Sequence, residues 1–176
     1  MAHILILYST VDGHTAKICQ RLEQVIEKNP HEVVVAPIGD SSSFELARFD
    51  KIVIGASIRY GKHRKEVLDF IAGNLSLLAS KPSAFFSVNI VARKPEKNTP
   101  ETNPYMRKFL SRVFWQPKLL AVFAGRLDYP SYGPVDRFMI RLIMRMTNGP
   151  TDPTTVVEFT DWNKVDDFAR QISKLK

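Results

Sequence analysis

The sequence predicts an α/β fold, a doubly wound five-stranded parallel sheet of order 2-1-3-4-5 with helices on both faces. Short apolar runs alternate with segments of helical periodicity along most of the 176 residues. Strands separated by helices pair in parallel through right-handed crossovers, which favours this architecture. The first apolar run also ends in a hydroxyl-rich, Gly-containing turn that opens a helix. We expect residues 1–176 to form a single domain.

Five apolar segments predict the strands of the sheet. In chain order they are His3–Tyr8, Glu32–Pro37, Lys51–Ser57, Ser83–Asn89 and Lys118–Gly125. The first holds the uninterrupted run Ile4-Leu5-Ile6-Leu7, so we expect that strand to be buried on both faces. A shorter strand is expected at Thr155–Phe159.

Four segments predict the helices that cover this sheet. They are Thr15–Lys28, Arg64–Leu78, Asn103–Trp115 and Asp161–Leu175. Asn29-Pro30 stops the first helix, and Asp161 is a suitable N-cap for the last. Residues 126–153 break the alternation, because this connection is long for a compact domain. We interpret it as an insertion that splits the last strand and contains an amphipathic basic helix.

Composition and charge restrict the functional class. Hydrophobic residues make up 44% of the chain, and no apolar run approaches the roughly 20 residues that span a bilayer. The N-terminal residues lack an export pattern, and the single cysteine, Cys19, fits a reducing cytoplasm. The net charge of +7 is uneven, because residues 51–150 carry 17 basic and 6 acidic groups. This middle segment therefore favours an anionic partner.

The turn after the first strand is a candidate anion site. Backbone N–H groups at a helix start point outward, and Ser and Thr hydroxyls add donors. Without a cation or three spaced glycines, the turn suits a single phosphate monoester, as in FMN. An ordinary N-capped helix start is the alternative. The residues expected at the phosphate are Ser9, Thr10, Val11, Asp12, Gly13, His14 and Thr15.

The loops after Lys51–Ser57 and Ser83–Asn89 lie at the same edge of the predicted sheet as this turn. Both would flank the flavin ring, and Tyr60 could stack on it. The alternative is that loops beside strand ends are simply often small and polar. The residues expected at the ring are Ser57, Ile58, Arg59, Tyr60, Ser87, Val88, Asn89, Ile90, Val91 and Ala92. The sequence shows no metal cluster and no nucleophile motif, and it identifies no catalytic side chain; this fits cofactor-borne chemistry.

The insertion carries a stripe of arginines on an apolar helix, Asp136–Met146. Arg137, Arg141 and Arg145 recur at i, i+4 and i+8. At roughly 1.5 Å per residue this helix is too short to span a bilayer. We expect it to lie at an anionic membrane surface, with the arginines at lipid phosphates and Phe138 and Met144 among acyl chains. The alternatives are a core helix or the seam of a homodimer.

Together these segments resemble a known family, the bacterial FMN- and quinone-dependent protoporphyrinogen IX dehydrogenases. The resemblance covers nearly the whole chain and departs from the expected pattern at Val135, where an aromatic residue is expected. The turn after the first strand is generic to flavodoxin-like proteins, whereas the basic run Val91–Lys97 and the insertion are more specific. The segments that carry the resemblance are Gly55–Gly61, Ser87–Lys97, Asp136–Met146 and Thr160-Asp161-Trp162.

The resemblance implies a flavoprotein oxidoreductase of haem biosynthesis. Such an enzyme oxidises protoporphyrinogen IX to protoporphyrin IX through FMN and passes electrons to menaquinone or ubiquinone. It would act peripherally at the cytoplasmic face of the bacterial inner membrane. The resemblance also implies that Gly125 and Asp152 close the flavin site, and that Arg59, Arg93 and Lys94 meet the substrate propionates.

Two other readings remain open from the sequence. The first is a flavodoxin-type electron carrier that serves a protein redox partner, although small carriers of that type are typically acidic. The second is a nucleic-acid or lipid-binding module on the same scaffold, which leaves the phosphate-like turn unexplained. We therefore expect no nucleic-acid partner.

Overall fold

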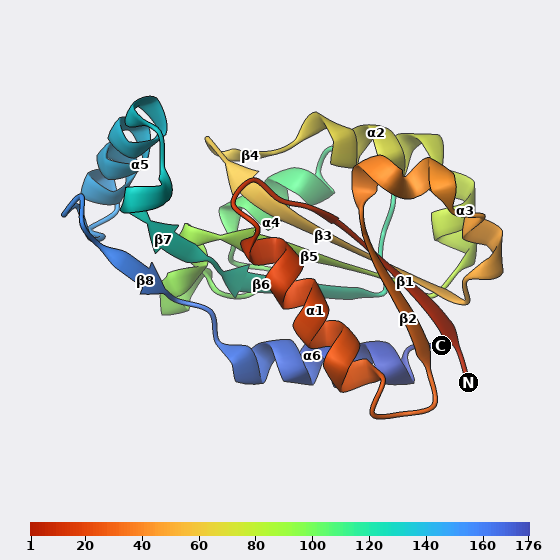
Figure 1. Ribbon diagram of the computed structural model, residues 1–176. Coiled ribbons are helices and arrows are strands. Elements are labelled where there is room, and N and C mark those ends of the chain that lie inside the picture. The colour runs from red at the N-terminus through yellow and green to blue at the C-terminus, as the bar shows by residue number, and fades with distance from the viewer.

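A single parallel sheet forms the centre of the computed structural model, which describes residues 1–176 (Figure 1). Its strands are β1 (His3–Ser9), β2 (Glu32–Pro37), β3 (Lys51–Arg59), β5 (Ser83–Asn89) and β6 (Leu119–Ala124). They pair in parallel in the order β2-β1-β3-β5-β6. The predicted fold class is therefore confirmed. The additional strand β4 (Lys62–His63) only forms a short hairpin with β3.

Helices cover both faces of the sheet (Figure 1). One face carries α1 (His14–Ile26) and α6 (Trp162–Lys174), and the other carries α2 (Lys65–Gly73), α3 (Leu75–Ser80) and α4 (Pro104–Leu110). The remaining α-helix, α5 (Pro134–Met146), stands apart from both layers. Short 3₁₀ helices lie at Ile38–Ser43, Leu46–Arg48, Ile90–Arg93, Pro95–Lys97 and Tyr129–Ser131. None of the helices combines the length and the apolar character needed to span a bilayer.

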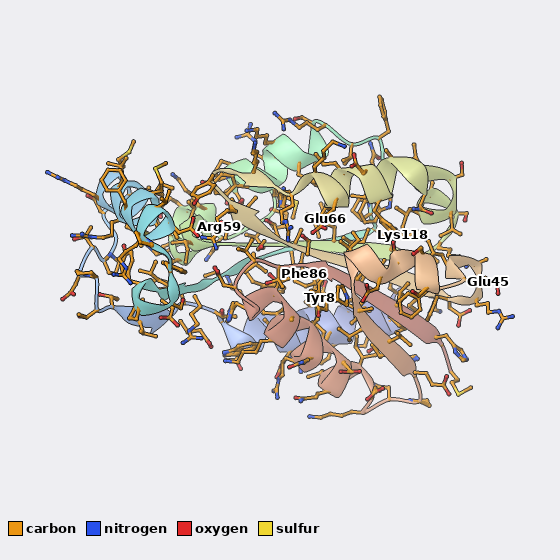
Figure 2. All side chains as sticks on the ribbon, turned by 45° about the horizontal axis from the view of Figure 1, so that its top comes forward. Tyr8, Glu45, Arg59, Glu66, Phe86 and Lys118 are labelled. Carbon is orange, nitrogen blue, oxygen red and sulfur yellow. The ribbon has the colours of Figure 1, made fainter.

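Continuous apolar strands follow from burial on two sides. Leu5 and Leu7 of β1 belong to the core beneath α2 and α4, whereas Ile4 and Ile6 belong to the core beneath α1 and α6. Successive side chains of a strand point to opposite faces, so both sets must be apolar. Phe86 of β5 lies on the α1 side (Figure 2). A Cβ at Gly55 would come within 2.2 Å of its ring, which explains the glycine in the neighbouring strand.

Two predicted helices end earlier than their periodicity suggests. The segment 64–78 is two helices, because Asn74 leaves helical geometry and its side chain donates to the Phe70 carbonyl. The helix predicted to reach Trp115 ends at Leu110. The chain turns there and buries the Trp115 indole, whose N–H donates to Ser83 Oγ at 3.1 Å. Asp161 caps α6 as predicted, accepting from the Asn163 and Lys164 N–H groups.

The insertion projects from the carboxyl ends of the strands (Figure 1). It contains β7 (Arg126–Asp128) and α5, and β8 (Val156–Glu158) follows it. The expected second piece of the last strand is β8, and it pairs antiparallel with β7 instead of rejoining the main sheet. The insertion has a small core of its own, composed of Leu127, Tyr129, Tyr132 and Met144.

Candidate functional site

A cavity with about 870 Å³ of empty volume lies where β1, β3 and β5 end, beside α5. Ligands in open α/β sheets bind outside the carboxyl ends of the strands, at the switch point between neighbouring crossovers. The wall of the cavity includes many of the residues that we predicted for the cofactor: Thr10, Val11, Asp12, His14, Thr15, Ser57, Ile58, Arg59, Tyr60, Val88, Asn89, Ile90, Val91 and Gly125.

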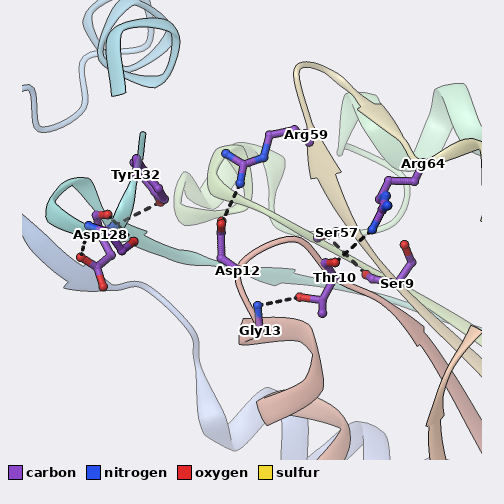
Figure 3. Close-up of polar contacts among 10 residues, drawn as sticks. Ser9, Thr10, Asp12, Gly13, Ser57, Arg59, Arg64, Asp128 and Tyr132 are labelled. Carbon is purple, nitrogen blue, oxygen red and sulfur yellow. Dashed lines mark hydrogen bonds and ion pairs between the residues drawn. The ribbon is translucent and has the colours of Figure 1, made fainter. Parts of the chain in front are cut away.

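The turn between β1 and α1 presents free donors to this cavity. Gly13 adopts φ 83° and donates its N–H to Thr10 Oγ1 at 3.0 Å, which fixes the turn (Figure 3). The N–H groups of His14 and Thr15 have no partner in the protein, as expected at a helix start. Thr15 also lines the cavity, and its buried hydroxyl has no partner. A buried unpaired hydroxyl is costly, so this set of donors fits an anionic ligand.

Ser9 supports the turn without lining the cavity. Its hydroxyl donates to Glu66 Oε1 at 2.6 Å, and Glu66 begins the helix that covers the opposite face (Figure 2). Arg64 donates to the Thr10 carbonyl at 3.2 Å, and Ser57 donates to the Ser9 carbonyl (Figure 3). Our placement of Ser9 at the phosphate is therefore replaced by a positioning role behind the turn. Gly13 also lies outside the cavity wall, and its positive φ shapes the turn.

His14 faces the cavity and is tied to the segment after the insertion. Its Nε2 lies 2.7 Å from the Thr160 hydroxyl, which in turn donates to the Ala124 carbonyl. Burial lowers the pKa of His14, although the nearby Glu158 opposes this shift. The ring therefore connects the turn to the segment that follows the insertion.

The loop after β3 is a tight hairpin that exposes an aromatic ring. Tyr60 and Gly61 have φ values of 50° and 76°, and Arg59 pairs with Lys62 across them. Such two-residue turns match the twist of the strands that they join. Tyr60 lines the cavity and is 45% exposed, so its ring is free to stack on a planar ligand.

The loop after β5 is held by buried amides. Asn89 accepts from the Ala92 N–H at 3.0 Å and from Asn103 Nδ2 at 3.1 Å. Asn103 caps α4 and also donates to the Lys97 carbonyl. These bonds fix the backbone of residues 90–93 against the cavity. Ala92 is buried outside the cavity wall, which corrects its predicted contact with the ring.

Ser87, also predicted at the ring, faces the other way. Its hydroxyl lies 2.9 Å from His63 Nε2, and the His63 ring packs against Phe85 and Phe109. Burial in this apolar setting lowers the pKa of His63 to about 4. The imidazole is therefore neutral at neutral pH and belongs to the structural support of the site.

Acidification should destabilise the fold through His63. Its pKa is about 6.5 in the unfolded chain and about 4 in the folded one. The unfolded state therefore binds the extra proton between these values, and stability falls as pH falls through the window. We expect a loss of about 2 to 3 kcal/mol between about pH 7 and about pH 4.5. His63→Gln should remove most of it in urea unfolding, and the more exposed His31→Gln should not. Equal pH dependence of the His63 variant and the wild type would contradict this assignment.

The cations expected at the substrate are largely engaged within the protein. Arg59 donates to Asp12 Oδ1 at 2.7 Å, and its guanidinium lies 5.9 Å from the Tyr60 ring centre and 5.7 Å from that of Tyr132 (Figures 2 and 3). Arg93 lines the cavity and donates to the carbonyls of Ile90 and Thr147.

Two other predicted contacts lie away from the cavity. Lys94 does not line it, because the chain turns outward into the 3₁₀ helix at 95–97. Asp152 is exposed and caps its own loop, accepting from the Thr154 N–H and hydroxyl. Its expected closure of the flavin site is therefore corrected, whereas Gly125 does line the cavity.

The inner face of α5 supplies a wall that our sequence reasoning missed. This wall is apolar and faces the strand-end loops across the cavity. Its residues, with their neighbours in the insertion, are Leu127, Tyr132, Ile140, Ile143, Met144 and Thr147. Gly61, Tyr105 and Arg126 complete the lining that was not predicted.

The orientation of α5 corrects two of the expected membrane contacts. Met144 is 1% exposed and packs in the core of the insertion. Arg137 is half-buried and donates to the Tyr129 and Tyr132 carbonyls, so it holds the loop before the helix. The exposed apolar residues of the helix are Val135, Phe138, Leu142 and Met146, at i, i+3, i+7 and i+11. This spacing marks one face of a helix, so the sequence did contain a signal for the exposed side of α5. Arg141 and Arg145 are exposed beside them.

The chain is similar to known proteins in both sequence and fold. Residues 5–154 match the flavodoxin domain family. The chain is 47% identical, over 97% of its length and 94% of the relative, to "Protoporphyrinogen IX dehydrogenase [quinone]" of Escherichia coli K12. Oxidised flavodoxin 1 from Bacillus cereus shares the fold, with a TM-score of 0.57 and 18% identity over 98% of each chain. A Fusobacterium nucleatum flavodoxin bound to flavin mononucleotide covers 100% of each chain, with a TM-score of 0.50 and 13% identity.

Proposed function

Since the chain belongs to the flavodoxin domain family, and within it to the family of the quinone-dependent protoporphyrinogen IX dehydrogenases, we propose that it oxidises protoporphyrinogen IX to protoporphyrin IX. The reaction removes six electrons and six protons in three two-electron steps. Three quinone molecules, menaquinone or ubiquinone, each receive two electrons and two protons and leave as quinols. The observation that carries this proposal is the cavity itself, in which a phosphate-type turn and an apolar wall face each other.

The residues of the turn fit FMN as the cofactor. The unpaired Thr15 hydroxyl and the free N–H groups of His14 and Thr15 would hold its phosphate. Tyr60 and the backbone of residues 88–91 would flank its ring. When bound, FMN supplies two-electron redox chemistry between the two substrates.

The apolar wall fits two lipophilic substrates. Ile140 and Ile143 present aliphatic surface to the cavity, where a tetrapyrrole or a quinone would displace water. No acid or base of the chain has to perform the oxidation, because the cofactor carries it. The role of the chain is to orient the substrate beside the flavin and to exclude water.

We also propose that the protein acts peripherally at the cytoplasmic face of the bacterial inner membrane. The support is the exposed apolar face of α5, bordered by Arg141 and Arg145. Such a face suits the headgroup region of an anionic bilayer. It would place the mouth of the cavity near the quinone pool.

Turnover separates this function from an electron-carrier module. Purified protein reconstituted with FMN should produce fluorescent protoporphyrin from protoporphyrinogen when a quinone is the only acceptor and oxygen is excluded. Thr15→Val should lose flavin and activity together, and Thr155→Val, whose hydroxyl lies outside the cavity, should keep both. Flavin binding without porphyrinogen turnover would favour the carrier.

A further inference from the structure

A basic groove adjoins the cavity at the β3–β4 hairpin. It holds about 280 Å³ of empty volume, and its cations are Lys62, Lys108 and Arg112. The floor is formed by His63, Leu68 and Phe109. Ile58, Gly61 and Tyr105 line both the groove and the cavity, so the two spaces meet at these residues.

The three cations of this groove are free. None of their side chains makes a hydrogen bond or an ion pair, although α2 on the same side contributes the pairs Arg64–Glu66 and Lys65–Asp69. No Asp or Glu lines the groove. Its floor adds no charge either, because His63 is buried and neutral at neutral pH. The groove therefore concentrates positive charge without an internal counterion.

The arginines of the cavity differ in this respect. Arg59 is paired with Asp12, and Arg126 is paired with Asp128 at 2.9 Å. The Arg93 guanidinium donates to two backbone carbonyls and to the Thr147 hydroxyl. An anionic group that entered the cavity would have to break one of these contacts, whereas the groove offers unpaired donors.

We infer that Lys62, Lys108 and Arg112 bind the carboxylate groups of the substrate while its ring system occupies the neighbouring cavity. This inference rests on the proposed function and names the specificity-determining residues for a dicarboxylate tetrapyrrole. Lys and Arg donate charge-assisted hydrogen bonds to carboxylates. The site replaces Arg59, Arg93 and Lys94 as the place where the propionates bind. Tyr105, at the boundary, borders both the ring and the carboxylate ends.

Binding of the product tests this site without turnover. The probes are protoporphyrin IX and its dimethyl ester in dilute non-ionic detergent, titrated against FMN-loaded protein by porphyrin fluorescence. The variant is Lys62→Gln/Lys108→Gln/Arg112→Gln. The matched control is Lys28→Gln/Lys174→Gln/Lys176→Gln, which removes three charges near the opposite end of the sheet (Figure 1).

The diacid should bind the groove variant about tenfold to a hundredfold more weakly than it binds the wild type. The ester should bind both proteins alike, and the control should retain wild-type affinity for the diacid. In turnover, the groove variant should show a raised KM with a nearly unchanged kcat, because its residues do not touch the reacting atoms. FMN content should stay at the wild-type level.

Two results would overturn the inference. Unchanged affinity of the groove variant for the diacid would exclude the groove as the carboxylate site. The same result is expected if the groove binds an acidic protein instead of the substrate. Equal losses for diacid and ester would indicate a packing defect. The proposed function has its own test, because it is wrong if the wild-type protein does not oxidise porphyrinogen. In that case, weaker binding of the diacid but not of the ester to the groove variant would still identify the groove as a carboxylate site.

Discussion

Replacing Thr15 with valine is expected to raise the dissociation constant of FMN by about tenfold to a hundredfold, because hydrogen bonds to charged groups contribute about 1.5 to 3 kcal/mol. The Thr15 hydroxyl is the one buried side-chain polar atom of the protein without a partner. Valine keeps the shape of the side chain and removes only this donor. Flavin fluorescence titration of the apoprotein measures the effect directly.

The same variant should weaken FMN binding without destabilising the apoprotein. The apoprotein no longer buries an unsatisfied hydroxyl, so its free energy of unfolding should stay equal or rise by about 1 kcal/mol. Urea unfolding of apoprotein and FMN-loaded protein separates the two effects, with Thr155→Val as the control. A less stable apoprotein with unchanged FMN affinity would assign Thr15 a packing role and leave the phosphate site unsupported.

Placing two glutamates on the outer face of α5, with Phe138→Glu and Leu142→Glu, should weaken binding to anionic vesicles by about a hundredfold. Phe138 is 66% exposed and Leu142 is 45% exposed. Burying each such side chain in an apolar phase stabilises association by about 1.5 to 3 kcal/mol. The added carboxylates also repel anionic lipid. Vesicle co-sedimentation measures this effect with phosphatidylglycerol-containing bilayers.

Phe114→Glu provides a matched control for this pair. Phe114 is 93% exposed but lies in the loop after α4, outside the insertion. Its substitution should leave vesicle binding unchanged if α5 is the docking element. FMN affinity should be unaffected in all three substitutions, because none of these residues lines the cavity. Wild-type vesicle binding by the α5 variant would remove the support for a peripheral membrane location.

Local sequence patterns were sufficient for the sheet and for the turn after β1. The Ile4–Leu7 run and the hydroxyl-rich turn encode their structure within a few residues, and the parallel pairing follows from the alternation with helices. The contacts of Arg59 could not be predicted in this way. Its pair with Asp12 joins residues 47 positions apart and depends on the shape of the β3–β4 hairpin.

The face of α5 was misjudged for a different reason. Its residues are nearly all large and apolar or arginine, so periodicity alone did not identify the buried side. Tertiary contacts determine which side of α5 is buried. Met144 packs with Leu127 and Tyr129, and Phe138 is left exposed. The arginine stripe therefore indicated the helix correctly but not which arginine faces solvent.

The base of the insertion has a consequence for how a bulky ligand reaches the cavity. The chain leaves and returns side by side, with Phe159 donating its N–H to the Gly125 carbonyl at 3.0 Å and with β7 paired to β8. The small core of the insertion is separate from the two cores that hold the sheet. Local opening in proteins follows such cooperative units. Displacing the insertion would therefore cost its own small core and the bonds from Arg93 to Thr147, but not the two cores that hold the phosphate turn.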